Sequence, residues 1–421
     1  MSLTDYLNQE QLRQLDGLEL IPSENYVSKD VLSALGSVYT NKYSEGYPGR
    51  RYYGGQQNTD KVESEAIELA KKLFKADHAN VQPHSGAPAN EAVYWSWLEP
   101  GDTVLAMDLS HGGHLTHGHP VTVTAKLFNF VRYKMKDIET GEIDYDEMRQ
   151  LALKHKPKIV LAGFSAYPRE LDYQRFADIA NEVGAMAMAD IAHIAGLIAA
   201  RKLANPFDFG FHVMTTTTHK TLRGPRGGMI LSRGKVGNPL KPPEKTLENL
   251  PTLIDRTVFP GLQGGPHMNN VLAKLVALKE ADTAEFRNYA GQTLTNAKAL
   301  AESMMDQGFK LITNGTDNHL ILADVNRSFG VDGKIAEEVL DKIGLTLNKN
   351  VLPDDPLPPF KPSGIRLGTP AMTTRGLKEP DMAKVAHWMK QAIVAKDDQP
   401  TLANLKAEVT KLAKQHSIPY L

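Results

Sequence analysis

A lysine near the middle of the chain lies in the segment that most suggests chemistry. Residues 215–228 read TTTTHKTLRGPRGG, and the lysine is Lys220. Four β-branched residues favour a strand, whereas the glycines and proline that follow force an irregular turn. A lysine at the carboxyl end of a parallel strand lies where α/β sheets build their sites, and near cations such as Arg226 it can lose its proton and act as a nucleophile. A surface lysine in a polar loop is the alternative.

An aspartate follows the apolar run 185–189, which is predicted to form a strand. This residue, Asp190, lies three positions before His193. A carboxylate at the end of a buried strand destabilises the fold unless a cation or a strong donor pairs with it. The protonated ring nitrogen of pyridoxal phosphate (PLP) would be such a partner. Capping of a helix is the alternative, but Asp190 and Lys220 together favour PLP.

Two glycine-containing segments could bind a phosphate. Ser85 and Gly86 precede Pro88 at the predicted start of an apolar helix that runs to Leu98, which leaves main-chain N–H groups free for an anion. Residues 261–266, GLQGGP, form a second such loop ahead of a helix. Ordinary helix capping uses the same residue types, so neither segment identifies a phosphate site by itself.

Four histidines lie close together after the strand predicted over 103–107. They are His111, His114, His117 and His119. Imidazoles at this density are compatible with a metal site, but no carboxylate follows at the usual spacing. The three glycines among them suggest a loop that wraps over a flat ligand. An imidazole stacked on an aromatic cofactor is therefore the favoured interpretation, and metal binding is the alternative.

Two further segments could contact substrates. Residues 44–55, SEGYPGRRYYGG, bring Glu45 together with tyrosines and glycines, as expected of a binding loop or of a tyrosine-rich subunit contact. Arg366 lies within the apolar strand predicted over 365–368. A partly buried guanidinium suits bidentate binding of a carboxylate, although pairing with an internal acid would explain it equally well.

The composition limits the classes of protein that can present these residues. The chain has 421 residues, no cysteine, and 48 Lys+Arg against 49 Asp+Glu, a formal net charge of −1. The absence of cysteine excludes disulfides, thiolate metal sites and cysteine nucleophiles. The near-neutral charge argues against a nucleic-acid binder and a polybasic membrane anchor. The first residues lack a signal-peptide pattern and the most apolar stretch, 183–200, contains Asp190, so a soluble cytoplasmic protein is expected.

Alternating strands and helices must position the candidate residues. Strands are predicted over 103–107, 158–164, 185–191, 213–218 and 229–232, and helices over 60–75, 145–154 and 173–183. Helical segments of this length between strands imply parallel crossovers and an α/β domain. A long helix over 268–306, bent near Gly291, precedes a smaller α+β unit. Its predicted strands are 320–325 and 365–368, and its predicted helices are 334–343, 381–395 and 402–415.

Taken together, these segments resemble serine hydroxymethyltransferase, a PLP-dependent enzyme of fold type I. The resemblance spans nearly the whole chain, over residues 20–26, 41–55, 84–90, 109–118, 164–167, 190–196, 215–228, 259–266, 348–350 and 364–370. It implies an N-terminal arm over 1–19, a large mixed-sheet α/β domain over 20–275 that binds PLP, and a smaller C-terminal α+β domain over 276–421. Ala87 stands where the family pattern has a serine, so one hydroxyl contact to the phosphate is expected to be missing.

The resemblance also implies roles for individual residues. Lys220 is expected to bind PLP covalently, Asp190 to hold the ring nitrogen, and His114 to stack on the ring. The cofactor is further expected to contact Ser85, Gly86, Ser165, His193 and His219, and Gly264 and Gly265 from a partner subunit. The substrates are expected to contact Ser23, Tyr52, Leu109, Gly113, Leu115, Asn350, Phe360 and the carboxylate-binding Arg366, together with Tyr53 and the acid–base group Glu45 from the partner subunit.

The implied reaction is the reversible transfer of the hydroxymethyl group of serine to tetrahydrofolate, which leaves glycine and 5,10-methylenetetrahydrofolate. Because residues of two chains complete each site, a homodimer is implied, or a tetramer built from dimers. A related PLP enzyme acting on α-methylserine and a folate-independent β-hydroxy-amino-acid aldolase are the alternatives within PLP chemistry. A metallohydrolase built on the histidine cluster is the alternative outside it. No metal, nucleic acid or membrane is expected as a partner.

Overall fold

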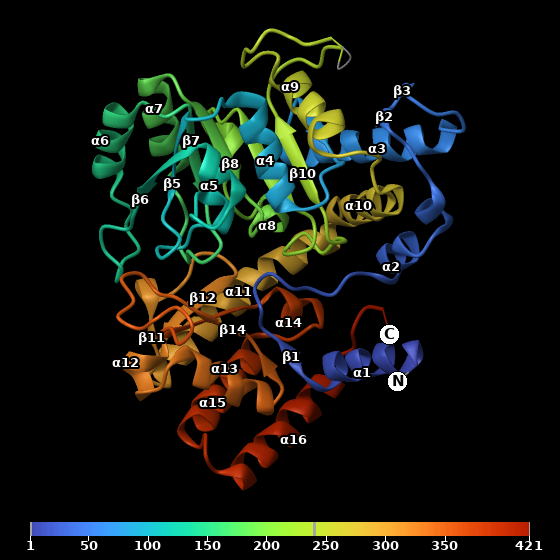
Figure 1. Cartoon of the computed structure of the whole chain (residues 1–421). Coiled ribbons are helices and arrows are strands. Elements are labelled where there is room, and N and C mark those ends of the chain that lie inside the picture. The colour runs from blue at the N-terminus through green and yellow to red at the C-terminus, as the bar shows by residue number, and fades with distance from the viewer. Residues whose placement is uncertain (1, 239–240, 421) are drawn as a thin grey trace.

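Seven strands form the central sheet of the structure, a computed structural model that describes residues 2–238 and 241–420 (Figure 1). Residues 1 and 421, at the ends of the predicted arm and small domain, lie outside the described part. In spatial order the strands are β4 (His78–Asn80), β10 (Gly228–Ser232), β9 (Val213–Thr217), β8 (Met186–Asp190), β7 (Ile159–Gly163), β5 (Thr103–Met107) and β6 (Asn129–Tyr133). Strand β10 runs antiparallel to both neighbours, β4 and β9, whereas the other adjacent strands are parallel, so the predicted α/β class with a mixed sheet is confirmed.

Both faces of this sheet are covered by helices, because each strand is apolar on both sides. Leu105 and Val160 face one core, whereas the adjacent residues Val104 and Leu161 face the other. Parallel strands that are buried on both faces require this nearly continuous hydrophobicity. The helices of this unit are α2 (Lys29–Leu35), α3 (Gln57–Phe74), α4 (Gly86–Trp97), α5 (Val123–Leu127), α6 (Tyr145–His155), α7 (Tyr173–Val183), α8 (Ala195–Ala199), α9 (Leu250–Arg256) and α10 (Met268–Ala281).

Strands β5, β7, β8 and β9 are parallel, so their carboxyl ends meet at one edge of the sheet. The histidine loop follows β5, Ser165 follows β7, Asp190 ends β8, and Lys220 follows β9. Segments that are far apart in sequence are thereby brought together where open α/β sheets bind their ligands.

A smaller unit packs against that edge, below the large sheet in Figure 1. Its antiparallel sheet has the order β11 (Lys310–Leu311), β12 (Leu320–Asp324), β15 (Gly364–Gly368), β14 (Asn348–Asn350). A two-residue strand β1 (Leu18–Glu19) also pairs with β13 (Leu345–Thr346). The helices of this unit are α12 (Val325–Phe329), α13 (Gly333–Lys342), α14 (Pro370–Thr374), α15 (Glu379–Val394) and α16 (Gln399–Gln415), together with α1 (Leu3–Asp16).

Each of the two units has its own hydrophobic core, and one helix contributes side chains to both cores. In α11 (Ala284–Asp306), Phe286 and Ala290 pack in the core of the large sheet, whereas Leu300 and Met304 pack in that of the small one. Leu18 also packs in the small core, although the chain then continues into the large unit. The division at residues 20 and 276 stays a prediction, which we take up under the proposed function.

The prediction of one helix over 268–306, bent near Gly291, is wrong. The chain forms two helices, α10 and α11, and Gly291 lies within the regular part of α11. The break falls at Thr283, whose side chain caps α11 by accepting a hydrogen bond from the N–H of Phe286 at 3.2 Å. A side-chain oxygen that satisfies a free N–H group starts a helix more strongly than one glycine interrupts it. Within the described residues, no helix is long and apolar enough to cross a membrane.

Arg375 joins the two ends of the chain, which lie side by side in Figure 1. It is 4% exposed and donates hydrogen bonds to five main-chain carbonyls, those of Gln14, Leu15, Gly17, Ala413 and His416. Several of these carbonyls belong to the last turns of α1 and α16, where a cation is favoured by the unpaired carbonyls and the helix dipole. The arginine therefore holds the N-terminal segment that leads into residues 20–26.

We expect Arg375→Leu to lower the free energy of unfolding by about 3 kcal/mol, because it leaves buried carbonyls without donors. Chemical denaturation of the full chain measures this loss. Arg149→Leu is the matched control, since Arg149 pairs with Glu182 on an exposed surface and its loss should change stability little. Equal stability of the two variants would contradict the prediction.

Candidate active site

A cavity of about 700 Å³ lies at the carboxyl edge of the large sheet, between the two units. It is lined by 14 of the 20 residues predicted from the sequence to form the site. These are Ser23, Ser85, Gly86, Leu109, Gly113, His114, Leu115, Ser165, Asp190, His193, His219, Lys220, Asn350 and Arg366. The remaining six, which are Glu45, Tyr52, Tyr53, Gly264, Gly265 and Phe360, do not line this cavity.

Lys220 lies in the turn after β9 and is 9% exposed. Its carbonyl oxygen accepts a hydrogen bond from the side chain of Asn25 at 2.9 Å, which fixes the turn. The pKa of Lys220 is lowered to about 8, mainly by burial and to a smaller extent by the charges of Arg366 and Arg226, whereas the charge of Asp190 acts to raise it. At a pKa of about 8, roughly a tenth of the amine is neutral and nucleophilic at pH 7, and about half at pH 8.

Asp190 presents a carboxylate to the cavity from the end of β8. Asn90 donates to its Oδ2 at 2.8 Å, and the N–H of Ala192 donates to its Oδ1 at 3.1 Å. Burial acts to raise the pKa of Asp190, but the hydrogen bond from His117, with a smaller contribution from that of Asn90, holds it well below its usual value. The group is therefore a permanent buried anion, and its Oδ1 can accept a further donor.

His117 is a second partner of Asp190 that the sequence did not identify. Its Nδ1 accepts a hydrogen bond from the main-chain N–H of His114 at 3.1 Å, so the proton must be on Nε2. Nε2 lies 3.1 Å from Asp190 Oδ2 and donates to it. His117 therefore holds the carboxylate in place from behind, and its position in a four-histidine cluster gave no sign of this role.

The other imidazoles of the cavity are kept neutral by burial. The pKa of His114 falls to about 4 and that of His219 to about 3, and burial also lowers the pKa of His193 well below its usual value. Nδ1 of His193 lies 3.3 Å from Nε2 of the buried His319, so one of these two nitrogens must carry a proton. His319, on the small unit, was not predicted from the sequence to belong to the site.

Arg366 crosses from the small unit to the large one. Its guanidinium donates to the side-chain oxygen of Asn348 at 3.1 Å and to the carbonyl of Ser165 at 2.6 Å. In the described part of the chain no carboxylate pairs with it, so the alternative of an internal acid partner does not hold. Burial lowers its pKa to about 10, which still leaves it charged at neutral pH. An unpaired guanidinium in a cavity favours a carboxylate ligand.

The start of α4 offers an anion cradle on the same cavity. Ser85 occupies the cap position, but its hydroxyl does not cap the helix, and the N–H groups of the first turn point out of the helix end. A Cβ on Gly86 would lie 2.8 Å from Thr217, so only glycine fits there without a shift. Nδ1 of His219 is buried and has no hydrogen-bond partner among the described residues. These groups together suit a phosphate.

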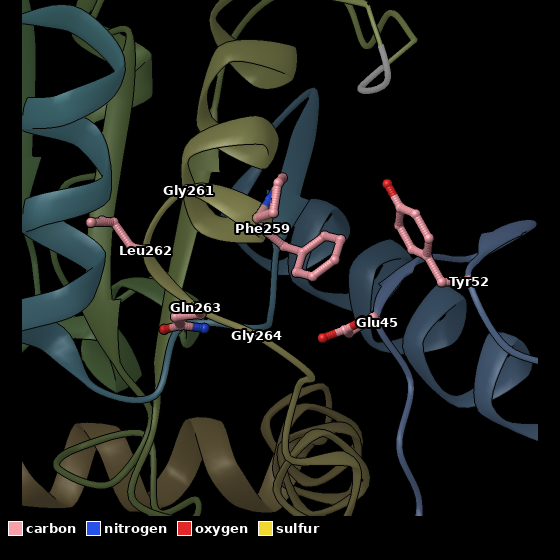
Figure 2. Close-up of a pocket in the computed structure, with 8 residues that line it drawn as sticks. Glu45, Tyr52, Phe259, Gly261, Leu262, Gln263 and Gly264 are labelled. Atoms are coloured by element: carbon pink, nitrogen blue, oxygen red, sulfur yellow. The ribbon is translucent and has the colours of Figure 1, made fainter.

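A second cavity, of about 490 Å³, holds several of the residues missing from the first (Figure 2). Glu45 and Tyr52 line it from one side, and Gly264 lines it from the loop that follows Phe259. Tyr53 packs against Tyr43 and stays half exposed, while Gly265 also lies against Tyr43. Phe360, at 84% exposed, touches neither cavity. One chain therefore presents the predicted residues as two separate groups.

The chain matches one known protein family over most of its length. A family model described as serine hydroxymethyltransferase matches residues 1–389. The chain belongs to the serine hydroxymethyltransferase family. Its members are enzymes of fold type I that use PLP as the cofactor and tetrahydrofolate as the co-substrate.

The first cavity fits the cofactor of this family. Its orphaned His219 Nδ1 and the free N–H groups at Gly86 suit the phosphate, and Asp190 Oδ1 suits a protonated ring nitrogen. The residue at 87 is an alanine, so it has no hydroxyl to offer the phosphate. The histidine cluster does not favour the metal alternative, because the described residues contain no group of three or more His, Asp or Glu arranged to hold a metal ion.

Removal of the Arg366 charge should raise the pKa of Lys220, since that charge acts to lower it. We expect Arg366→Gln to shift the pH profile of PLP binding by the cofactor-free protein. The pH at which the binding rate reaches half of its maximum should rise by roughly one unit. Stopped-flow absorbance across pH 6–10 measures the midpoint. Arg149→Gln, on the far surface, should leave it unchanged. A midpoint that falls in the Arg366 variant would contradict the assignment.

Proposed function

We propose that this protein transfers the hydroxymethyl group of serine reversibly to tetrahydrofolate, giving glycine and 5,10-methylenetetrahydrofolate. One observation carries the proposal, namely that three groups line the same cavity. They are Lys220, whose pKa is lowered, the buried carboxylate of Asp190, and Arg366, which has no carboxylate partner among the described residues. This combination provides a nucleophilic amine, a partner for a protonated ring, and a receptor for an amino-acid carboxylate. Family membership supports the choice of serine and folate as substrates.

PLP, when bound, supplies an electron sink that stabilises negative charge on the α-carbon of an amino acid. Lys220 would hold it covalently, and Asp190 would keep a proton on its ring nitrogen. Asp190 can do this only because His117 and Asn90 keep the carboxylate ionised in a buried position. His114, held neutral by burial, offers a flat uncharged surface to the ring.

Arg366 binds the α-carboxylate of serine and sets the orientation of the amino acid. The carbonyl of Ser165 and the amide of Asn348 fix two of its N–H groups, so the rest of the guanidinium faces the cavity in one orientation. A fixed carboxylate limits the rotation of the substrate, so that a single bond at the α-carbon is presented for cleavage. Ser23 lines the same cavity and is proposed to contact the substrate.

The partner subunit of a homodimer completes each site in this proposal. Glu45, Tyr52, Tyr53, Gly264 and Gly265 lie away from Lys220 in one chain, and most of them line or adjoin a different, open cavity. The partner's Glu45 would exchange a proton with the substrate hydroxyl, and the partner's Gly264 and Gly265 would close over the phosphate. A dimer of such dimers is compatible with the same arrangement.

Folate is proposed to bind at the mouth of the first cavity. Leu109, Gly113, Leu115 and Asn350 line it there, and they provide an apolar wall with one amide. Phe360 is largely exposed on the proline-rich loop 353–362, whose Pro359 and Pro362 line this cavity, and it is proposed to cover bound folate. This wall favours a folate-dependent reaction over a folate-independent aldolase. A preference for α-methylserine depends on space at the α-carbon, and no residue described above selects for it.

The proposed organisation is a PLP-binding domain over 20–275, a small domain over 276–421 and an arm over 1–19, acting in the cytoplasm. The two hydrophobic cores support two domains. The contacts of α1 with α16 and of Leu18 with the small core connect the arm to the small domain. The formal charge of −1 gives no reason to expect a nucleic acid as a partner.

A visible spectrum of the purified protein tests the proposed reaction. We expect bound PLP to absorb in the visible range, glycine to perturb that band, and a strong long-wavelength band to develop only when glycine and tetrahydrofolate are both present. Lys220→Ala should lose the covalent absorbance and turnover with serine. Cleavage of serine at the same rate with and without tetrahydrofolate would favour the aldolase instead.

Mixed dimers test whether two chains share each site. Lys220→Ala and Glu45→Gln chains are each expected to be inactive alone. In their heterodimer one site carries both defects and the other carries neither, so a random mixture should recover about a quarter of wild-type activity. Co-expression with two different affinity tags allows the heterodimer to be isolated. Absence of recovery would place both residues in the site of a single chain. As a control, Lys220→Ala chains are paired with Asp190→Asn chains. Lys220 and Asp190 line the same cavity of one chain, so each site of this heterodimer carries one defect and no activity should be recovered.

A further inference from the structure

A second buried lysine lies behind the phosphate cradle and takes no part in the chemistry described above. Lys274, on α10, is 1% exposed. Its Nζ donates three hydrogen bonds, all to main-chain carbonyls: Val81 at 2.7 Å, Pro83 at 3.0 Å and Gly228 at 2.8 Å. Carbonyls alone do not neutralise the charge of a buried ammonium, and burial lowers the pKa of Lys274 to about 7, although the charge of Glu63 acts to raise it. A further anion nearby would therefore favour the charged form.

The carbonyls that Lys274 binds belong to the two segments that shape the cradle. Residues 81–83 lead directly into Ser85 and Gly86 at the start of α4. The N–H of Gly228 donates to the carbonyl of Pro83 at 3.0 Å, and a Cβ on Gly228 would lie 2.4 Å from the carbonyl of Ser85. Lys274 thus fastens the start of β10 to the chain that forms the cradle, and a displaced ammonium would release both.

Lys274 acts on the cradle through its positive charge as well as through its hydrogen bonds. Burial lowers the pKa of His84, and the positive charge of Lys274 contributes to that lowering, so its field reaches the residue next to Ser85. The nearby imidazole of His219 is neutral, because burial lowers its pKa to about 3. Apart from the exposed Arg226, the cradle therefore has few charges of its own to offset a phosphate dianion. In a dry interior, a cation behind the cradle interacts strongly with that dianion.

We propose that Lys274 is a positioning residue for the phosphate of PLP, acting from behind the cradle through its charge and through the main chain of residues 81–83 and 228. This inference rests on the cofactor site described above. It does not depend on which amino acid or folate the enzyme uses. The phosphate dianion stabilises the buried ammonium, and the ammonium in turn makes the cradle selective for the phosphorylated cofactor.

The test compares PLP with pyridoxal, which lacks the phosphate. The full chain is stripped of cofactor, and both dissociation constants are measured by quenching of tryptophan fluorescence. Lys274→Gln keeps amide donors without the charge, so we expect PLP binding to weaken on the order of tenfold while pyridoxal binding changes by less than about twofold. Lys274→Arg should restore much of the preference for PLP. Lys279→Gln, on an exposed part of the same helix, is the matched control.

Gly227→Ala provides a second, independent variant in case Lys274→Gln does not fold. The new Cβ would come within 2.5 Å of Lys274 Cε and 3.1 Å of Nζ, so it displaces the ammonium without removing its charge. We expect a selective loss of PLP affinity here as well, with thermal unfolding used to confirm that the protein is folded. Equal weakening of PLP and pyridoxal, or weakening of neither, would overturn the proposal. Loss of serine turnover with normal PLP selectivity in Lys274→Gln would also count against it.

Discussion

The structure of the site depends on one buried carboxylate. Asp190 ends a strand in the middle of the sheet, where an isolated negative charge would strongly destabilise the fold. Three donors from three parts of the chain compensate it: His117 from the loop after β5, Asn90 from α4, and the N–H of Ala192. The histidine loop and the start of α4 are therefore positioned by the need to satisfy Asp190. The cradle at Ser85 and the imidazole of His114 follow from the same contacts, since they lie on these two elements.

The balance of charge around Asp190 explains why so many histidines occupy one cavity. Burial keeps the imidazoles of His114, His193 and His219 neutral, so they add surface and hydrogen-bonding groups without adding charge. The positive charges that line the cavity come from Arg366, Arg226, Lys349 and the protonated fraction of Lys220. A carboxylate and a phosphate can then bind at separate places within the same cavity. The net charge of −1 for the whole chain carries no information about this local arrangement.

Sequence patterns predicted the features that local residue types determine. Strands β5 and β9 and helix α7 fall where apolar runs and periodicity placed them, and Lys220 and Asp190 were found because each follows such a strand. The short strands β4 and β6 were missed, because His78–Asn80 and Asn129–Tyr133 include polar residues that gave no clear strand pattern. Pairing with strands that were already placed, not local propensity, makes these segments extended.

The partners of the predicted residues could not be found in the same way. His117 lies 73 positions from Asp190, and the other histidines in its cluster have the same local context but different contacts. His319 lies just before β12 and Lys274 lies within α10, and only the folded chain brings them against His193 and the cradle. Long-range packing decides which imidazole or ammonium is buried, and burial decides which is charged.

The separation of the site residues into two cavities is itself a constraint on how the protein works. Glu45 accepts a hydrogen bond from the hydroxyl of Tyr43 at 3.1 Å, and Gly265 packs against that same ring. Tyr43 thus contacts Glu45, Tyr53 and Gly265, three of the residues proposed to serve another subunit. Arg51 anchors the adjoining hairpin from beneath, by donating to Glu63 and to the carbonyls of Ser44 and Gly46. A group of residues that is rigid within its own chain can meet a second chain as a preformed surface, without ordering a loop at each encounter. The buried network under this hairpin therefore stabilises the surface that is proposed to complete the site of a neighbouring subunit.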